Sequence, residues 1–426
     1  MMRSLILAVA LGSAAAGDFV VGGLRTEDGS RRETLFLCST TMLKHADMLY
    51  RVDASTLNVT ASVALPADAD ADGWKKTVCG RAPAVVAESA DAATTTLYWP
   101  LDVMYASKPG AGPAILGITS GYAGLAVATR TPLPIACTLA RSDYCAASGL
   151  LVDGGDLWIA VNEYLLNYEL PLTPESKPAS TTKYVAAESG WACPDGYLPT
   201  LKSLTKRLGK LYGVAVCPGD APARTALVIR FHKAGGPEAW ATVPDATGAT
   251  TDALYVAGDA LFVAGTAPGR VYETPAALYA VDDGAGSANL TVGEAPTAVL
   301  ASETFLGVLS AVSYDAGGLF VSGVTCATHP LPPAALSAGG DVDLPPYCGL
   351  KEAPAGLVAR VDVASGGGVS APAADDVYRL LGAGPFLYGL RPGASGVGET
   401  LVKYDNTGAR LDALASLVLP VVPLGA

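Results

Sequence analysis

The sequence predicts an all-β protein: a single β-propeller, with seven four-stranded antiparallel blades as the preferred count and six or eight as the alternatives. A Leu-aromatic strand pattern recurs along the chain at intervals of 50 to 68 residues. Dipeptides that favour tight hairpin turns, such as Gly-Asp and Gly-Gly, precede most copies of the pattern. No long periodicity of 3.6 residues indicates helices. Because one four-stranded sheet cannot bury both of its faces, we expect the repeats to stack around an axis.

Each repeat is expected to contain four strands, A to D, that follow one another in the sheet. Strand B carries the recurring pattern, whose anchors are Leu35, Leu97, Leu157, Leu211, Leu261, Leu319 and Leu387. Strand C often ends in an acidic residue, as in "LYRVD", and strand D is supplied by segments such as "VTASVAL". The near-repeat "TDALYVAGDALFVAG" at 251–265 is therefore predicted to be strands A and B of one blade.

One stretch resembles known propeller repeats. The segment "LYRVDASTLNVTASVAL" at 49–65 resembles the passage from strand C to strand D in the YVTN and quinoprotein-like propeller families. The resemblance extends to the repeat pattern of the mature chain, and it implies a fold without implying an activity. The tryptophan-aspartate dipeptide of WD40 blades and the paired glycines of kelch blades are not repeated.

The first residues predict export. Residues 1–17, "MMRSLILAVALGSAAAG", combine a basic start, a short apolar run and small residues, which is the layout of a secretory signal peptide. The apolar run is too short to span a bilayer. We therefore expect residues 18–426 to form one propeller domain that is secreted or extracellular, with no membrane insertion after signal cleavage.

Eight cysteines fit an oxidising compartment, where an even number of cysteines predicts disulfide bonds. None lies in a C-x-x-C pair, which argues against zinc. The expected pairs are Cys38–Cys79, Cys137–Cys145, Cys193–Cys217 and Cys326–Cys348. Two glycosylation sequons begin at Asn58 and Asn289, and both lie in expected C-D turns.

The repeat also predicts two unlike faces. In a propeller, the A-B and C-D turns emerge on one side, and the B-C and D-A connections emerge on the other. In this chain, the A-B and C-D turns are mostly short. The B-C and D-A connections are long, as in "AGTAPGRVYETPAA" and "TRTPLPIACTLARSDYC". We call the two sides the short-turn face and the long-connection face. All eight cysteines are expected on the long-connection face, opposite the sequons.

The net charge of the chain limits the kinds of partner that it can bind. The chain has 28 basic and 40 acidic residues, a net charge of −12. This balance argues against nucleic acid and anionic membranes, which need clustered Lys and Arg. The one basic cluster, "LKSLTKRLGK" at 201–210, is interpreted as a solvated hairpin.

One acidic segment is a weak candidate for Ca²⁺, and we expect no other cofactor. Asp68, Asp70 and Asp72 stand at alternate positions before a glycine, like the opening of a D-x-D-x-D-G calcium loop. The pattern then departs from such loops, because Lys76 and Cys79 occupy positions where acids would be needed. A solvated acidic loop is the competing interpretation.

No catalytic residue can be assigned from the sequence. The three histidines, His45, His232 and His329, lie in different repeats, and no nucleophile elbow or phosphate-binding loop is present. Aromatic and arginine side chains, which are common anchors of recognition surfaces, are better represented on the expected long-connection face. The candidates are Trp74, Arg141, Tyr144, Trp191, Tyr197, Arg270, Tyr272 and Tyr347.

Two hypotheses follow for function. The preferred one is a binding module for an extracellular glycan, peptide or protein that uses the long-connection face. The alternative is a propeller enzyme, either a calcium-dependent hydrolase or lactonase, or a carbohydrate-active enzyme with acidic residues at the axial channel. Its candidate acids are Asp143, Asp195, Asp220, Glu273 and Glu352.

Overall fold

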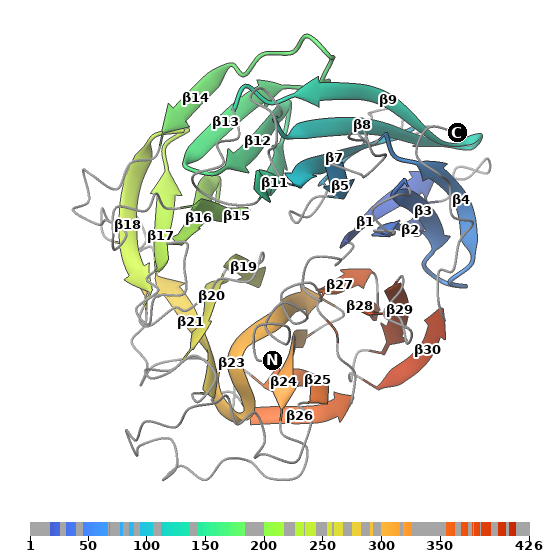
Figure 1. Cartoon of the computed structure of the whole chain (residues 1–426). Helices are drawn as coiled ribbons and strands as arrows, with labels where there is room; N and C mark the ends of the chain where they lie inside the picture. The colour runs from blue at the N-terminus through green and yellow to red at the C-terminus, as the bar shows by residue number, and fades with distance from the viewer. Residues whose placement is uncertain are drawn as a thin grey trace, which may run out of the picture.

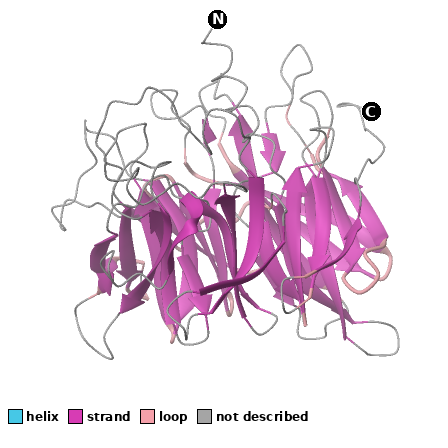
Figure 2. Cartoon of the chain, turned by 90° about the horizontal axis from the view of Figure 1, so that it is seen from below, coloured by secondary structure: helices cyan, strands magenta, loops and turns pink. Residues whose placement is uncertain are grey.

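The described residues consist of strands and their connections, with no helix among them (Figure 2). The computed structural model describes residues 18–25, 31–39, 46–66, 68, 77–79, 85–88, 94–104, 112–135, 144–145, 147–183, 200–216, 226–233, 235–243, 254–257, 260–266, 275–282, 290–292, 300–315, 318–325, 355–362, 368–373, 377, 379–383, 385–392, 399–405 and 409–414. Their sheets stand side by side around a central axis (Figure 1). The protein is therefore an all-β, single β-propeller.

Four sheets form the first half of the ring. Blade 1 consists of β1 (Asp18–Arg25), β2 (Arg31–Ser39), β3 (Met48–Asp53) and β4 (Val59–Ala64). Blade 2 consists of β5 (Thr77–Cys79), β6 (Val85–Glu88), β7 (Thr95–Met104), β8 (Ala114–Gly121), β9 (Gly124–Pro132) and β10 (Tyr144–Cys145). Blade 3 consists of β11 (Ala147–Asp153), β12 (Asp156–Val161), β13 (Tyr164–Glu169) and β14 (Ser180–Lys183). Blade 4 consists of β15 (Thr200–Arg207), β16 (Lys210–Val216), β17 (Ala226–Phe231) and β18 (Pro237–Val243).

Two further sheets complete the ring. One eight-stranded sheet consists of β19 (Leu254–Ala257), β20 (Ala260–Thr266), β21 (Pro275–Asp282), β22 (Thr291–Val292), β23 (Leu300–Asp315), β24 (Gly318–Thr325), β25 (Ala355–Asp362) and β26 (Gly368–Ala373). The last blade consists of β27 (Arg379–Ala383), β28 (Phe386–Pro392), β29 (Glu399–Tyr404) and β30 (Arg410–Leu414).

The prediction of seven separate four-stranded blades is wrong: the described residues form five blades and one eight-stranded sheet. The cause is β23, which is 16 residues long. Its first residue, Leu300, pairs with β21, and its last residue, Asp315, pairs with β24. One strand with a partner at each end joins two successive meanders into a continuous sheet, and this sheet contains both the Leu261 and the Leu319 anchors.

The repeat pattern determines the register of the strands. The seven anchors lie in β2, β7, β12, β16, β20, β24 and β28. Each anchor pairs with the following strand, as in Leu35↔Val52, Leu157↔Tyr168 and Leu387↔Tyr404. All six of these side chains are fully buried. The near-repeat at 251–265 forms β19 and β20, which pair as expected.

The core lies between neighbouring sheets. Side chains from blade 2 (Tyr98, Ile115) pack against side chains from blade 3 (Leu157, Leu166) in one buried cluster. Equivalent clusters join blade 1 to blade 2, blade 3 to blade 4, the eight-stranded sheet to the last blade, and the last blade to blade 1. The innermost strands contact one another in the order β1, β6, β11, β15, β19, β23 and β27, and β27 contacts β1 again. The ring is therefore closed.

Blade 3 departs from the predicted division into two faces. Its B-C connection, between β12 and β13, is the tight pair Asn162-Glu163, and Asn162 has a φ of 50°. Asparagine is one of the few residues that adopt this conformation readily. Its C-D connection, 170–179, is the longer one. The expectation that every B-C connection is long is therefore wrong for this blade.

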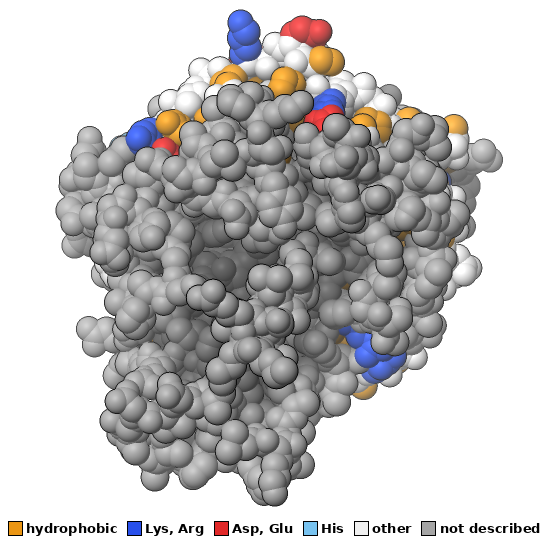
Figure 3. Space-filling model, in the orientation of Figure 1, with side chains coloured by type: hydrophobic (Ala, Val, Ile, Leu, Met, Phe, Trp, Pro, Cys, Tyr) orange, Lys and Arg blue, Asp and Glu red, His pale blue; other side chains and the backbone are white. Residues whose placement is uncertain are grey.

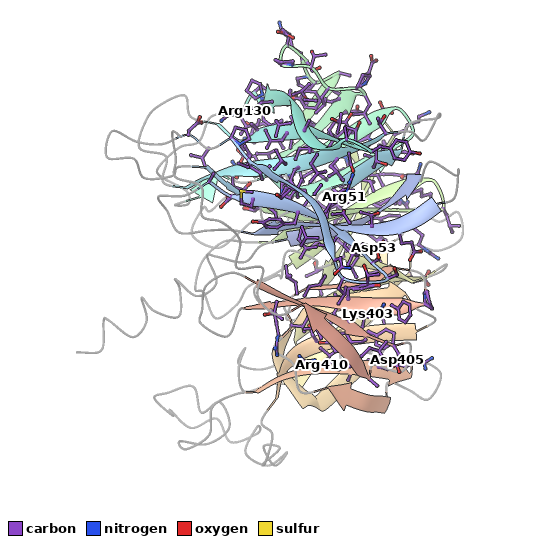
Figure 4. The ribbon with its side chains drawn as sticks, turned by 90° about the vertical axis from the view of Figure 1, so that its right-hand side faces the viewer. Arg51, Asp53, Arg130, Lys403, Asp405 and Arg410 are labelled. Atoms are coloured by element: carbon purple, nitrogen blue, oxygen red, sulfur yellow. A yellow bond between two sulfur atoms is a disulfide. The ribbon has the colours of Figure 1, made fainter. Side chains whose placement is uncertain are left out.

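Among the described residues, side chains of the last blade contact blade 1 at the closing seam of the ring. The Tyr388 hydroxyl donates a hydrogen bond to the Ala54 carbonyl oxygen at 2.6 Å, and the Lys403 ammonium donates one to the Ser55 carbonyl oxygen at 3.1 Å. Lys403 also lies 3.9 Å from the centroid of the Phe386 ring. Burial, with smaller effects from the charges of nearby carboxylates, raises the pKa of Tyr388 to about 12. Figure 4 shows Lys403 at this boundary, close to Asp53.

An equivalent contact fastens blade 1 to blade 2. Arg51 Nη1 donates to the Gly121 carbonyl oxygen at 2.7 Å and to the Ser120 hydroxyl at 3.2 Å, and its Nε donates to Thr60 at 3.0 Å. Arg51 and Lys403 occupy the same register, since Arg51 pairs with Phe36 and Lys403 pairs with Tyr388. At both seams, last blade to blade 1 and blade 1 to blade 2, a cation on strand C therefore donates a hydrogen bond to a carbonyl oxygen at the C-D turn of the next blade.

Asp53 stabilises the turn between β3 and β4, and this turn also contacts the last blade at the closing seam. Its Oδ1 accepts hydrogen bonds from the backbone N–H groups and hydroxyls of Ser55 and Thr56. Burial by itself raises the pKa of the Asp53 carboxyl, but these hydrogen bonds outweigh burial, and the pKa lies below its ordinary value of 3.8. Because the folded state lowers this pKa, the carboxylate stabilises the fold at pH values above 3.8 and loses that effect as the pH falls.

We expect Asp53→Ala to lower the free energy of unfolding by about 1 kcal/mol at pH 7, since hydrogen bonds to a charged but partly exposed group are reduced by solvent. Urea unfolding of both proteins between pH 7 and pH 3 measures the difference. The difference should shrink as the pH falls. A difference that stays constant over this range would contradict the assignment.

Candidate binding face

A disulfide bond joins blade 1 to blade 2 on the long-connection face. Cys38 lies near the end of β2, Cys79 ends β5, and their Cα atoms are 6.3 Å apart. Both side chains are buried in a cluster that includes Trp99 and Leu101. This pair confirms the predicted Cys38–Cys79 connection. Cys137, Cys193, Cys217, Cys326 and Cys348 lie outside the described residues, so the other pairings stay predictions.

Strand β7 projects beyond its blade and carries a short strand on each edge. On one edge, β5 pairs with its end through Cys79↔Leu101 and Thr77↔Val103. On the other edge, β8 begins at Ala114, opposite Leu101, and past this point β10 pairs with β7 through Cys145↔Val103 and Tyr144↔Met104. We call β5, residues 101–104 of β7, and β10 the rim platform. It brings the backbone of Tyr144, a predicted binding-face residue, onto blade 2.

Two buried carboxylates tie the rim platform to its neighbours. Asp47 and Asp102 are each 1% exposed. Asp47 Oδ2 accepts a hydrogen bond from the Cys79 N–H at 2.8 Å, and Asp102 Oδ1 accepts one from the Ala147 N–H at 3.2 Å. The first contact links blade 1 to β5, and the second links β7 to the start of blade 3. Sequence reasoning missed both residues, although each is an acid at the long-connection end of an apolar strand.

One of the three residues of the weak calcium candidate, Asp68, forms an ion pair with Arg130. Arg130 donates two hydrogen bonds to the Asp68 carboxylate, at 3.0 and 2.7 Å. The hydrogen bond with Asp68 raises the pKa of Arg130. Asp70 and Asp72 lie outside the described residues, among which no group of three or more His, Cys, Asp or Glu is placed to hold a metal ion.

Most of the other predicted site residues lie in segments that the structure does not describe. These are Trp74, Arg141, Trp191, Tyr197, Arg270, Tyr272 and Tyr347 among the binding-face candidates, Asp143, Asp195, Asp220, Glu273 and Glu352 among the acids, and His45, His329 and Asn289. His232 follows β17 and is exposed, and Asn58 is exposed in the C-D turn of blade 1. Glycosylation at Asn58 stays a prediction.

The visible surface shows no single chemical type among the described side chains. At the outer edge of the ring, near β9 and β14, apolar, basic and acidic side chains are mixed (Figure 3). Within the described ranges, no helix is long and apolar enough to cross a membrane.

These features define the class of protein as a single β-propeller with a disulfide-braced rim on one face. No protein-family model and no curated protein sequence matches the chain. Solved structures with similar folds include a putative 6-phosphogluconolactonase from Bacteroides fragilis, with 11% sequence identity, a TM-score of 0.49, and coverage of 95% of this chain and 96% of that one. They also include Drosophila Semaphorin 1a, extracellular domains 1–2, with 8% identity, a TM-score of 0.41, and coverage of 95% and 85%.

An exo-1,5-alpha-L-arabinanase from a bovine ruminal metagenomic library is a third example, with 13% identity, a TM-score of 0.34, and coverage of 66% of this chain and 97% of that one. The three proteins differ in kind, and the similarities are distant. They carry no argument about activity, and the assignment of the fold depends on the sheets of this chain.

Proposed function

We propose that this protein is a secreted or cell-surface binding module that recognises an extracellular glycan, peptide or protein through its long-connection face. The observation that carries this proposal is the construction of the rim platform. A disulfide, two buried carboxylates and two short added strands hold the end of β7 in place. These contacts lie at the long-connection end of blades 1 and 2 and at the start of blade 3.

Bracing of this kind suits recognition, because a surface that is already ordered loses less conformational entropy when it binds. The rim platform also has an aromatic residue, Tyr144, at its edge in β10. Tyrosine supplies a large contact area with few rotatable bonds and is enriched among residues that dominate binding energy. We therefore expect Tyr144 to contribute to the binding surface.

The test is to produce residues 18–426 through a secretory pathway and to screen the protein on glycan arrays and on extracellular protein libraries. We expect a ligand whose affinity falls at least about tenfold in Tyr144→Ala, as for a residue that contributes more than about 1.4 kcal/mol. Tyr122→Ala is the matched control, since Tyr122 is exposed in the β8–β9 turn on the opposite face.

Equal losses in both tyrosine variants, or a ligand that binds only the short-turn face, would contradict the proposal. Conversion of a bound glycan or lactone into product by the wild-type protein would favour the enzyme alternative.

A further inference from the structure

The segment 171–182 of blade 3 is rich in hydroxyl groups and in proline. It forms most of the C-D connection and the start of β14. Five of its twelve residues are Ser or Thr, and three are Pro. In an exported protein, this composition is typical of segments that carry O-linked sugars. We call residues 171–182 the hydroxyl segment, and neither of the two N-glycosylation sequons lies in it.

The hydroxyl segment is attached to the ring through its backbone and one apolar side chain. Leu172 is 3% exposed and packs in the cluster shared by blades 2 and 3. The Thr131 hydroxyl of β9 donates a hydrogen bond to the Thr173 carbonyl oxygen at 2.8 Å. The Ala179 N–H donates one to the Asn167 carbonyl oxygen at 2.7 Å. These contacts fix the path of the segment along the surface without using the side chain of Thr173.

Two threonines of the hydroxyl segment, Thr173 and Thr181, are exposed. Thr181 lies in β14, whose described partner is β13 alone, and β14 is on the outer side of the ring (Figure 1). The backbone of a strand is extended, and Pro174 favours an extended backbone at Thr173, the residue before it. The free edge of β14 offers N–H and C=O groups to an enzyme that binds its acceptor as an added strand. Both hydroxyls are therefore accessible on an extended chain.

The C-D turn of blade 1 shows that exposure alone does not make a hydroxyl available. Ser55 and Thr56 are exposed, but their hydroxyls donate hydrogen bonds to Asp53 Oδ1 at 2.6 and 2.9 Å. They stabilise the turn, and modifying them would remove these donors. In the part of the chain that the structure describes, no carboxylate holds the Thr181 hydroxyl in this way. Thr181 can therefore be modified without the loss of a contact within the fold.

We propose that the hydroxyl segment is a site of O-linked glycosylation, with Thr181 and Thr173 as the acceptors. In the reaction, the threonine oxygen forms a bond to the anomeric carbon of a nucleotide sugar. The bond between that carbon and the phosphate breaks, the nucleoside diphosphate leaves, and the hydroxyl proton passes to the leaving diphosphate. The modification rests on the export that residues 1–17 predict, which is also part of the proposed function, and it does not depend on the ligand of the long-connection face.

The test uses residues 18–426 secreted from cultured animal cells, after enzymatic removal of N-linked glycans. Mass spectrometry is applied to proteolytic fragments that contain the hydroxyl segment. We expect the wild-type fragment to exceed the mass of its polypeptide by whole sugar units, and fragment sequencing to place these units on Thr181 and Thr173. Thr173→Ala/Thr181→Ala should lose the added mass. Thr173→Ser/Thr181→Ser keeps both hydroxyls and should retain it.

Ser62→Ala/Thr94→Ala is the matched control, because both side chains are exposed but no proline lies within three residues of either. It should carry the same sugars as the wild type, and thermal unfolding of each variant confirms that it is folded.

The proposal is overturned if the secreted wild-type fragment has the mass of the polypeptide alone, or if the added mass is phosphate. It is also overturned if Thr173→Ala/Thr181→Ala retains the full added mass. This double alanine variant should bind any ligand of the long-connection face as the wild type does, and Tyr144→Ala should carry the same sugars. The test of glycosylation and the test of the long-connection face can therefore fail separately.

Discussion

Replacing Cys38 and Cys79 together with alanine is expected to lower the free energy of unfolding by about 4 kcal/mol, because the disulfide closes a segment with a sequence separation of 41. The bond restricts the unfolded chain, and its loss makes the unfolded state more favourable. In the folded state, it joins β2 of blade 1 to β5 of blade 2. We therefore expect the seam between these blades to loosen first.

Guanidinium unfolding, followed by tryptophan fluorescence, measures this effect, and Trp99 is a suitable reporter because it belongs to the same buried cluster. Hydrogen exchange should show faster exchange at β5 than at β17 of blade 4. The control is Tyr122→Ala, a change in an exposed turn, which should stay within about 0.5 kcal/mol of the wild type. Unchanged unfolding in the double alanine variant would mean that the bond contributes nothing to the fold.

The closing seam should give the second large effect. We expect Tyr388→Ala to lower the free energy of unfolding by about 4 kcal/mol, as is typical when a fully buried aromatic side chain is removed. Tyr388 packs with Leu35, Val52 and Leu401 in a cluster shared by the last blade and blade 1. Its partner Ala54 is 334 residues away along the chain. No described strand crosses this seam, so side-chain packing and the hydrogen bonds from Tyr388 and Lys403 hold it.

Tyr388→Phe separates the contribution of the hydroxyl to stability from that of the aromatic ring. It keeps the packing and removes one buried hydrogen bond, and we expect a loss of about 1 to 2 kcal/mol. Urea unfolding measures both variants, and Tyr122→Ala on an exposed turn should change stability by less than about 0.5 kcal/mol. If Tyr388→Ala changed the free energy of unfolding as little as this control does, the stability of the propeller would not depend on the closing seam.

Strand positions in this protein could be predicted well because the information is local. Leu35, Leu157 and Leu387 lie in buried strands as expected, since a Leu-aromatic pattern bounded by tight turns identifies a strand without reference to distant residues. The Cys38–Cys79 pair was also predictable, because the order of strands within a repeat placed both residues on one face. Here, a short-range pattern was enough to decide a contact between blades.

Other features depended on distant pairing and were not predictable. The length of β23, which joins two meanders, depends on partners at both of its ends. The pairing of β10 with the end of β7 depends on where β8 begins, since β8 leaves residues 102–104 of β7 unpaired on that edge. Asp47 and Asp102 looked like ordinary acids, because the N–H groups that they bind come from neighbouring blades.

The sequence by itself therefore determined the type of repeat and the strand that carries each anchor. Only the tertiary structure decided how many sheets the repeats form and how the rim platform is built. The physical reason is that alternation and turn chemistry act between near neighbours in the chain, whereas backbone pairing depends on which segments meet when the ring closes.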